Sequence, residues 1–281
     1  MLAAGLEVVG PLFTQDTDEL ARIYDEISVT RQFPSGQRLV ANLAIQPGER
    51  VLDLGCGTGL LADHIAGIVG PNGRVLGIDP LPRRIALAEA RARAAGRSNL
   101  EFRPGNAYRL DELAAGGAGF DVVCLNAMLH WLPEKAGPLA ACRRLLRSGG
   151  RIGINTRVKG EPSRLQEIAT ELLDEPPFDR YPRPPNGITF RIDADEMRSL
   201  LEAAAFALIT LEVREIERVH PTAEVAVRFA EAALFGNFLG HLPDDLKADA
   251  RSAIVRRLSA VATSRGIIQR RKRMIVVAAK R

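Results

Sequence analysis

Residues 51–60 read VLDLGCGTGL, and this stretch decides the fold. Its apolar first half is typical of a buried strand, with Asp53 near the strand's end, and a glycine turn then opens a helix. Glycine has no Cβ, so backbone N–H groups in such a turn can approach a nucleotide-like ligand closely. A dinucleotide fingerprint would need a glycine three positions after Gly57, where this chain has Leu60. The spacing therefore argues against a dinucleotide.

A second short strand with an acidic residue at its end follows the glycine turn. Residues 73–80 read GRVLGIDP, and Asp79 lies 22 positions after Gly57. An acidic side chain at that distance can accept hydrogen bonds from both ribose hydroxyls of a nucleoside. The alternative is that Asp79 caps the helix expected to begin at Pro82. The order of strand, glycine turn, helix, strand and acid favours the ribose.

Together these features resemble the class I S-adenosylmethionine (SAM) methyltransferases, whose first motif has closely spaced glycines after an acid. The resemblance implies SAM as the cofactor, S-adenosylhomocysteine (SAH) as the product, and no metal. The cofactor contacts that it implies are Tyr24, Asp53, Gly55, Cys56, Gly57, Gly59, Asp79, Pro80, Asn106, Ala107, Asn126 and Ala127. Asn106 departs from the family, which usually has an acid there to bind adenine. Its side-chain carbonyl can still accept a hydrogen bond from the exocyclic amine.

The resemblance covers most of residues 40–216 and the last strand. It implies a Rossmann-like, doubly wound α/β fold with a seven-stranded, mostly parallel sheet whose last strand is antiparallel. We divide the chain into an N-terminal helical cap, residues 1–45, and a methyltransferase domain, residues 46–281. Substrate-binding insertions are expected at about 157–192 and 217–268. The layout is most similar to small-molecule methyltransferases of the trans-aconitate and malonyl-carrier-protein kind.

Several element boundaries can be predicted from periodicity and turn residues. A first helix should run to about Val29, and Pro34-Ser35-Gly36 should separate it from a second. The last two strands are expected at Ala207–Ile216 and Lys272–Ala279. Two helices should fill the chain between them.

Composition limits the class of protein. The chain has 281 residues, 46% of them hydrophobic and 26% charged, as in a globular α/β protein. No apolar run approaches the roughly 20 residues of a membrane span, and MLAAG at the start lacks the basic residues of a signal peptide. Three cysteines are too few for a disulfide framework. We expect a cytoplasmic monomer or homodimer without a membrane partner.

The positive charge, a net +4, is spread over the chain mostly as arginine. Only Arg270–Arg273 forms a cluster, and we interpret it as a solvated strand end; the alternative is a phosphate-binding patch. No DNA partner is expected, because NAML at 126–129 is not the Pro-Pro-aromatic turn of DNA amino-methyltransferases. Three scattered cysteines do not supply the thiols that arsenic methylation needs, and no metal-ligand spacing is present.

The chemistry is expected where the sheet order reverses, at the carboxyl ends of the first and fourth strands. The family resemblance implies that the backbone carbonyl of Asn126 binds the methionine ammonium. His130 is a candidate general base, because its ordinary pKa is near 6.5; alternatively it packs under Trp131. Tyr24 is either a lid over the cofactor or a core aromatic.

The substrate is left open. Trp131, Arg157, Tyr181, Phe235 and Phe238 are candidate substrate contacts. Arginines after the fifth strand and in the proline-dense loop, namely Arg157, Arg180, Arg183 and Arg191, could bind a carboxylate instead.

Three functions are weighed. The first is a methyltransferase acting on an oxygen, carbon or nitrogen of a small metabolite. The second acts on RNA or protein, and would need the basic cluster at 270–273 to continue into the active-site mouth. The third is a SAM-binding scaffold without catalysis. The sequence favours the first.

Overall fold

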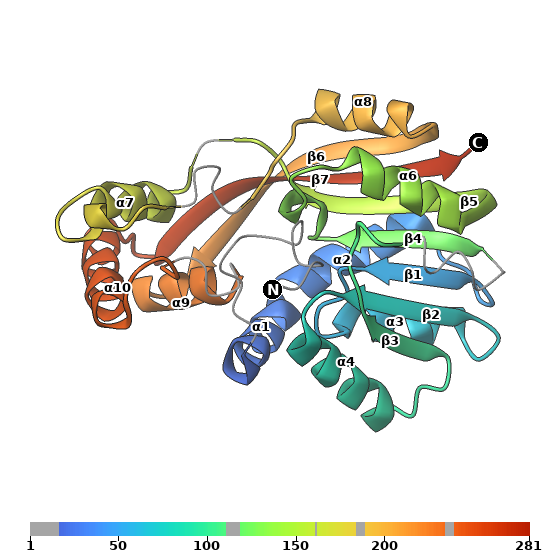
Figure 1. Cartoon of the computed structure of the whole chain (residues 1–281), viewed down its shortest axis with the longest axis horizontal. Helices are drawn as coiled ribbons and strands as arrows, with labels where there is room; N and C mark the ends of the chain where they lie inside the picture. Colours follow the sequence, from blue (N-terminus) through green and yellow to red (C-terminus); the bar gives the residue numbers. More distant parts are fainter. Residues whose placement is uncertain (1–16, 111–118, 161, 184–188, 234–238) are drawn as a thin grey trace, which may run out of the picture.

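A seven-stranded sheet with the order β3-β2-β1-β4-β5-β7-β6 forms the centre of the molecule (Figure 1). The computed structural model describes residues 17–110, 119–160, 162–183, 189–233 and 239–281. Strands β1 to β5 are parallel, and β7 pairs antiparallel with both β5 and β6. This is the predicted doubly wound sheet with an antiparallel last strand. In the part of the chain that is described, no helix is long and apolar enough to cross a bilayer.

The elements alternate along the chain as the sequence predicts. The strands are β1 (Arg50–Leu54), β2 (Arg74–Asp79), β3 (Leu100–Pro104), β4 (Phe120–Asn126), β5 (Leu146–Arg157), β6 (Phe206–His220) and β7 (Ile267–Lys280). The helices are α1 (Asp18–Thr30), α2 (Gln32–Leu43), α3 (Leu60–Val69), α4 (Pro82–Ala94), α6 (Ala136–Leu145), α7 (Arg164–Leu173), α8 (Ala194–Ala203), α9 (Ala223–Ala233) and α10 (Asp244–Ser259). Short 3₁₀ turns η1 (Leu129–Trp131) and η2 (Phe178–Arg180) complete them.

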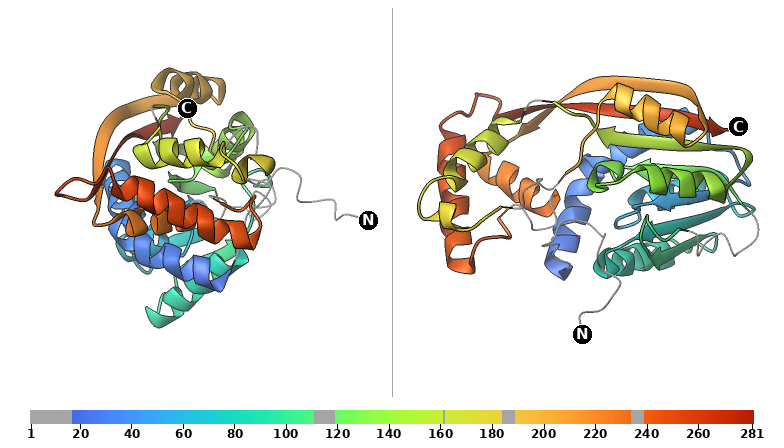
Figure 2. Two further views of the ribbon diagram at one scale, coloured as in Figure 1. Left: turned by 90° about the vertical axis from the view of Figure 1, so that its left-hand side faces the viewer. Right: turned by 45° about the horizontal axis from the view of Figure 1, so that its top comes forward.

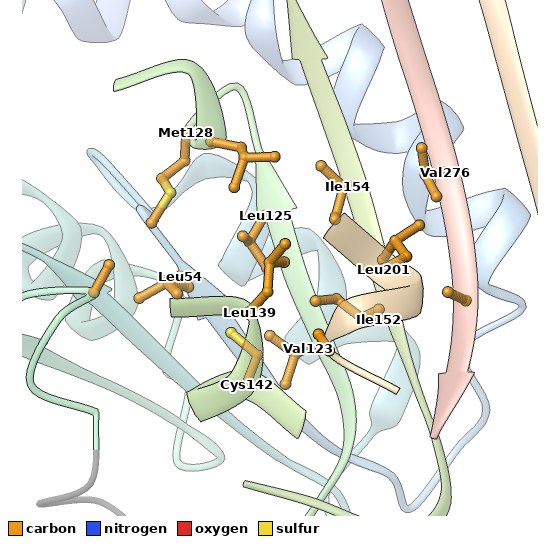
Figure 3. Packing of buried hydrophobic residues seen from close by; sticks show 14 of the residues in the cluster. Leu54, Val123, Leu125, Met128, Leu139, Cys142, Ile152, Ile154, Leu201 and Val276 are labelled. Atoms are coloured by element: carbon orange, nitrogen blue, oxygen red, sulfur yellow. The ribbon is translucent and has the colours of Figure 1, made fainter. Parts of the chain in front are cut away.

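Apolar layers cover both faces of the sheet. Helices α2, α3 and α4 pack on one face, where Leu39 and Leu43 of α2 join the same buried cluster as Ile275 of β7. Helices α6 and α8 pack on the other face, and Figure 3 shows Leu139 and Leu201 from these helices against the strands. Because strand side chains alternate between faces, odd-numbered residues near Ile275 face α2. This parity decides which arginines of β7 face inward.

Strands β6 and β7 continue past the sheet as a long two-stranded ribbon (Figure 1). Helices α7, α9 and α10 lie at the far end of the ribbon and share their own apolar cluster (Figure 2). Helix α1 contacts both α9 and α4. The ribbon, α1 and this helical group therefore enclose a region beside the carboxyl ends of β1, β4 and β5.

Two predicted boundaries are wrong for identifiable reasons. The break between the first helices lies at Arg31 (φ −128°, ψ −72°), and Pro34 lies inside the first turn of α2. The first turn tolerates proline because its N–H groups have no intrahelical acceptor. The last strand begins at Ile267, so Arg270–Arg273 lie within β7 and are not a strand end. A run of basic residues does not reveal that every second one is turned inward.

Candidate functional site

A narrow pocket lies at the carboxyl ends of β1 and β4, where the strand order reverses. It is lined by Tyr24, Ser28, Gln32, Phe33, Asp53, Gly55, Cys56, Thr58, Leu60, Leu61 and Asn126. Its volume is about 30 Å³. Tyr24 and Ser28 of α1 close one side of it.

The glycine loop 55–59 forms one wall of this pocket and requires glycine at each of its three positions. Gly55, Gly57 and Gly59 all have positive φ (79°, 56° and 81°), a region that L side chains rarely adopt. A Cβ on Gly55 would lie 2.7 Å from the Cβ of Met128, and one on Gly59 would lie 2.7 Å from the ring of Phe102. The loop can therefore pack against the following strands and present its backbone to the pocket.

Several buried polar atoms of the pocket have no hydrogen-bond partner. Among the residues that the structure places, both carboxylate oxygens of Asp53 are unpartnered, and so are Ser28 Oγ and Gln32 Oε1. Asp53 is 1% exposed. Burial, with a smaller contribution from the charge of Asp79, raises the pKa of Asp53 to about 7. Unpartnered buried oxygens are costly, and this group of acceptors suits a cationic donor such as an ammonium group.

Asp79 lies beside the glycine loop and fixes its shape. Its Oδ2 accepts a hydrogen bond from the Gly57 N–H at 3.0 Å, and its Oδ1 accepts one from the Leu81 N–H at 3.0 Å. The side chain thus contacts the loop and also Leu81, the residue before α4. Ribose binding by Asp79 stays a prediction. Pro80, which follows it, is exposed.

The next residues lie at or just past the carboxyl ends of β3 and β4, and Asn126 among them lines the pocket. Asn106 Oδ1 accepts from the Tyr108 N–H at 2.9 Å, and Ala107 is buried. Asn126 donates through Nδ2 to the Gln32 carbonyl at 3.3 Å, and its Oδ1 accepts from Asn155 Nδ2 at 2.6 Å. These side-chain amides hold the α1–α2 corner against the end of β4.

Ala127 has a positive φ of 58°, and its N–H donates to the Asn155 carbonyl at 2.7 Å. Cys56 is buried, and burial raises the pKa of its thiol well above the ordinary value. Each predicted cofactor residue is therefore in or beside the glycine loop, the ends of β1–β4, or α1.

Helix α1 covers the glycine loop and is held there by hydrogen bonds and an ion pair. The Tyr24 ring lies over the Arg84 guanidinium, 3.7 Å from Cζ to the ring centroid. Asp25 accepts from Thr58 Oγ1 at 2.5 Å, and both of its oxygens accept from Arg91 Nη2 at 2.8 Å. Arg91 Nε also donates to the Thr58 carbonyl. Asp25, Thr58 and Arg91 form a latch between α1 and the loop.

Replacing Asp25 with asparagine should loosen this latch. The two side chains of the Asp25–Arg91 pair are each about one third exposed, so we expect a loss of about 1 kcal/mol from the closed position of α1. SAH association and dissociation, followed by stopped flow, should then both become about fivefold faster with a nearly unchanged Kd. Hydrogen exchange over residues 18–30 should rise. The matched control is Asp18→Asn. Asp18 lies on the same helix as Asp25, and this change breaks its exposed pair with Arg83 of α4. Unchanged rates in Asp25→Asn would show that α1 is not a lid.

His130 lies beyond the cofactor pocket, in η1. It is 3% exposed, and its Nδ1 lies 3.2 Å from Thr156 Oγ1. The Trp131 ring centroid is 5.2 Å away at a tilt of 37°. Burial and then the charges of Arg157, Arg273 and other cations lower the pKa of His130 well below 6.5. The imidazole is therefore neutral at physiological pH and able to accept a proton.

The structure separates the predicted substrate contacts. Arg157 lies at the end of β5 near His130, whereas Tyr181 packs against the apolar cluster of α7, α9 and α10. Arg191 also lies near His130. Arg183 pairs with Asp174, and Arg180 is exposed. Phe235 and Phe238 lie outside the described residues. No cluster of three or more potential metal ligands occurs among the residues that are placed.

Sequence reasoning missed the polar residues that α1 and α2 bring to the site. Ser28, Gln32 and Asp25 belong to no motif, and their distances from the glycine loop along the chain vary with every helix geometry. The available signal was Tyr24 alone, which marked α1 as a lid candidate. The latch and the unpartnered acceptors become visible only when α1 is placed over the loop.

Comparison with known proteins agrees with this geometry. Residues 45–204 match the family model described as a methyltransferase domain. The chain belongs to the SAM-dependent methyltransferases of class I. An arsenite methyltransferase from Halobacterium salinarum is 32% identical over 57% of this chain and 38% of its own length. The aklanonic acid methyltransferase DauC from a Streptomyces species is 35% identical over 52% of this chain and 64% of its own length.

The matched part of this chain thus covers only 38% and 64% of the lengths of these two relatives. Among solved structures, the YcgJ protein from Bacillus subtilis has a TM-score of 0.57 at 18% identity, over 88% of this chain and 98% of that one. At this identity the likeness concerns the fold. It covers a larger share of the chain than the family model, which matches residues 45–204.

Proposed function

We propose that this chain transfers a methyl group from SAM to an oxygen, carbon or nitrogen atom of a small metabolite. The observation that carries the proposal is the set of unpartnered oxygens of Asp53, Ser28 and Gln32, which all face one pocket beside the glycine loop. An ammonium group provides the three donors that such acceptors lack. The methionine end of SAM carries one.

The other cofactor contacts follow from the order of the strands. Asp79 would accept hydrogen bonds from the ribose hydroxyls, and the Asn106–Ala107 turn would hold the adenine. Tyr24 would cover the cofactor once α1 closes. When bound, SAM supplies an electrophilic methyl group on a positively charged sulfur. The protein then has to align the nucleophile in line with the breaking C–S bond, and alignment alone can supply roughly 7–11 kcal/mol.

His130 would take the proton that an oxygen or nitrogen nucleophile releases. The bond from the nucleophile to the methyl carbon forms as the C–S bond breaks, the electron pair of that bond stays on sulfur, and the proton goes to the imidazole. The neutral ring of the free protein has a site for that proton, but the burial and the nearby cations that lower its pKa also make it a weak base, so the role requires an anion that compensates those cations. A positioned base contributes about two to four powers of ten.

Arsenite is a poor substrate candidate despite the arsenite methyltransferase relatives. Trivalent arsenic is held by thiolates, and all three cysteines of this chain are buried. Cys56 and Cys124 share one face of the sheet, whereas Cys142 lies in the cluster on the other face. Burial raises the pKa of each thiol, to about 12 for Cys142. We therefore favour an organic metabolite as the substrate. We further propose that the protein acts in the cytoplasm as a monomer or homodimer.

A proton balance tests the role of Asp53. Its pKa of about 7 means that the free protein holds a proton there below pH 7, whereas an ammonium partner favours the carboxylate. SAH binding at pH 6 should thus release about one proton, and affinity should rise about tenfold per pH unit up to about pH 7 and then level. Calorimetry in buffers of different ionisation enthalpy measures the release.

Asp53→Asn should bind SAH at least about tenfold more weakly and without this proton release, because an amide cannot ionise. Asp249→Asn, an exposed change on α10, is the matched control. Equal proton release in the wild type and Asp53→Asn would contradict the assignment of Asp53.

The activity itself is tested by following label from methyl-tritiated SAM into small metabolites, bulk RNA and protein, each then treated with mild base. Label in the metabolite fraction supports the proposal, and volatile methanol would identify a carboxyl ester. Label in RNA or stable label in protein would support the alternative substrates. SAH binding without any transfer would indicate a scaffold.

A further inference from the structure

Six half-buried arginines gather beside the cofactor pocket. Arg157 (β5), Arg271 and Arg273 (β7) and Arg218 (β6) come from three neighbouring strands, Arg31 from the α1–α2 corner and Arg191 from the segment before α8. In register, Arg273 lies opposite Arg157, and Arg218 opposite Gln269. Cross-strand neighbours share a face of the sheet, and by parity with Ile275 this is the face turned toward α1 and α2. We call these residues the arginine cluster.

Within the described residues, every hydrogen-bond and ring partner of the arginine cluster is neutral. Arg273 donates to Asn155 Oδ1 at 3.1 Å, Arg271 to Gln269 Oε1 at 3.1 Å and Arg191 to Thr189 Oγ1 at 3.3 Å. Arg31 and Arg218 both lie over the Phe229 ring, at 4.4 and 4.8 Å. Arg31 also lies 3.3 Å from His220 Nδ1, and burial beside Arg31 lowers the pKa of His220 to about 4, so this ring is neutral too.

No carboxylate in the described part of the chain lies within 4 Å of the arginine cluster, and two of its donor atoms are buried without any partner. These are Arg31 Nη1 and Arg271 Nε. Burial and mutual repulsion lower the pKa of Arg157 well below its ordinary value. Concentrated, uncompensated charge of this kind is costly to fold, which points to a ligand that supplies the missing negative charge.

The exposed basic residues of the same ribbon are arranged differently. Arg270 lies near Glu215 and Glu217, and Arg265 pairs with Glu217. Arg214 lies opposite Arg273 in register and so shares its face of the ribbon, but it pairs with Glu212. These exposed arginines thus each have a carboxylate nearby, whereas the six members of the arginine cluster have none within 4 Å among the described residues. A nucleic acid would need the opposite arrangement, with free cations on the exposed side.

Space and position agree with a small ligand. Cavities of about 290 and 600 Å³ flank the arginine cluster; Arg157, Arg191 and Arg271 line the first, and Arg31, Arg218 and Arg273 the second. Each cavity also has one glutamate in its lining, Glu215 in the first and Glu217 in the second, and these carboxylates lie against the exposed Arg270 and Arg265. Arg273 is joined to the cofactor pocket through Asn155, which donates to Asn126 at 2.6 Å. The charges of Arg157, Arg273 and Arg191 contribute to the lowered pKa of His130. The arginine cluster therefore adjoins both the candidate base and the cofactor pocket.

We propose that the arginine cluster binds the substrate and that the substrate is a small polyanion, carrying at least two carboxylate or phosphate groups. The proposal rests on the proposed methyl transfer only in calling this ligand the substrate. Arginine forks bind such groups through paired, charge-assisted hydrogen bonds. Two or more negative charges are needed because a single one would leave most of the cluster uncompensated.

Citrate serves as the probe, with acetate as the monoanion control, by calorimetry on the SAH-loaded protein at constant ionic strength. Citrate should bind and acetate should not.

Arg157→Met and Arg271→Met should each weaken citrate binding at least about tenfold and leave the SAH affinity within about twofold. Both variants should also raise the Tm of the ligand-free protein, because they remove a buried, uncompensated charge. Arg228→Met, an exposed change on α9, should alter neither. Inorganic pyrophosphate, tried in the same way, separates a phosphate preference from a carboxylate one.

Failure of this inference is distinguishable from failure of the proposed function. SAH binding with no citrate or pyrophosphate binding would overturn the anion site and leave the cofactor assignment intact. Citrate binding without SAH binding would do the reverse. Equal citrate affinity in wild type and both variants, or tight salt-dependent binding of a 20-nucleotide RNA in place of citrate, would also overturn it.

Discussion

Replacing Asp79 with alanine should weaken SAH binding about 100-fold or more. Two ribose hydroxyls donating to a charged carboxylate account for this size, since each such hydrogen bond contributes about 1.5–3 kcal/mol. The same change removes the acceptor that holds the Gly57 N–H at 3.0 Å, so the glycine loop loses its support as well. Calorimetric titration with SAH measures the loss.

Two comparisons separate ribose binding from loop support in Asp79→Ala. The 2′-deoxyribose analogue of SAH should bind the wild type more weakly than SAH, but the variant should bind both equally. Thr58→Ala, which removes a hydroxyl from the α1 latch without touching Asp79, should keep the preference for the ribose. If Asp79→Ala still discriminated between SAH and its deoxy analogue, Asp79 would be a loop-supporting residue only.

Replacing His130 with glutamine should lower kcat by about two to four powers of ten while leaving the SAH affinity unchanged. Glutamine can still form a hydrogen bond with Thr156 but cannot act as a base near neutral pH. His241→Gln, which removes an imidazole from the helical group at the end of the ribbon, should leave kcat as it is. A nearly normal kcat in His130→Gln would show that His130 supports Trp131 and takes no part in proton transfer.

The pH profile carries a second signature of His130. Burial and neighbouring arginines lower its pKa in the free enzyme, so the neutral, active form persists below pH 6.5. With SAM saturating, so that Asp53 is already ionised, the acid limb of kcat/KM for the methyl acceptor should therefore lie below pH 6.5. A bound polyanion compensates the arginine cluster and raises the pKa of His130, so the acid limb of kcat should lie at higher pH. His130→Gln should lack both limbs.

The α/β fold and the cofactor could be predicted from local sequence because each depends on residues close together in the chain. The glycines at 55, 57 and 59 have to be glycine wherever they occur in such a turn, since all three have positive φ. Asp79 follows at a distance fixed by one helix and one strand. These constraints arise within about 30 residues, and tertiary packing does not change them.

Local patterns also explain the errors at element ends. Pro34 and Gly36 are usual helix breakers, yet both lie in α2. A Cβ on Gly36 would lie 2.8 Å from Asn126 Nδ2 and 2.9 Å from the Leu61 side chain, so glycine there allows α2 to approach the cofactor pocket. Packing, rather than propensity, decided this helix.

The sequence by itself determined the sheet, the glycine loop and the acids that identify SAM. The arginine cluster was decided only by tertiary structure. Its members lie between positions 31 and 273, and in an arginine-rich chain nothing local distinguishes them from solvated residues. The pairing of β5, β6 and β7 puts four of them on one face, and the placement of α1 and α9 encloses them. Burial and the lack of a carboxylate within 4 Å in the described part of the chain give these arginines their chemical meaning, and both are properties of packing.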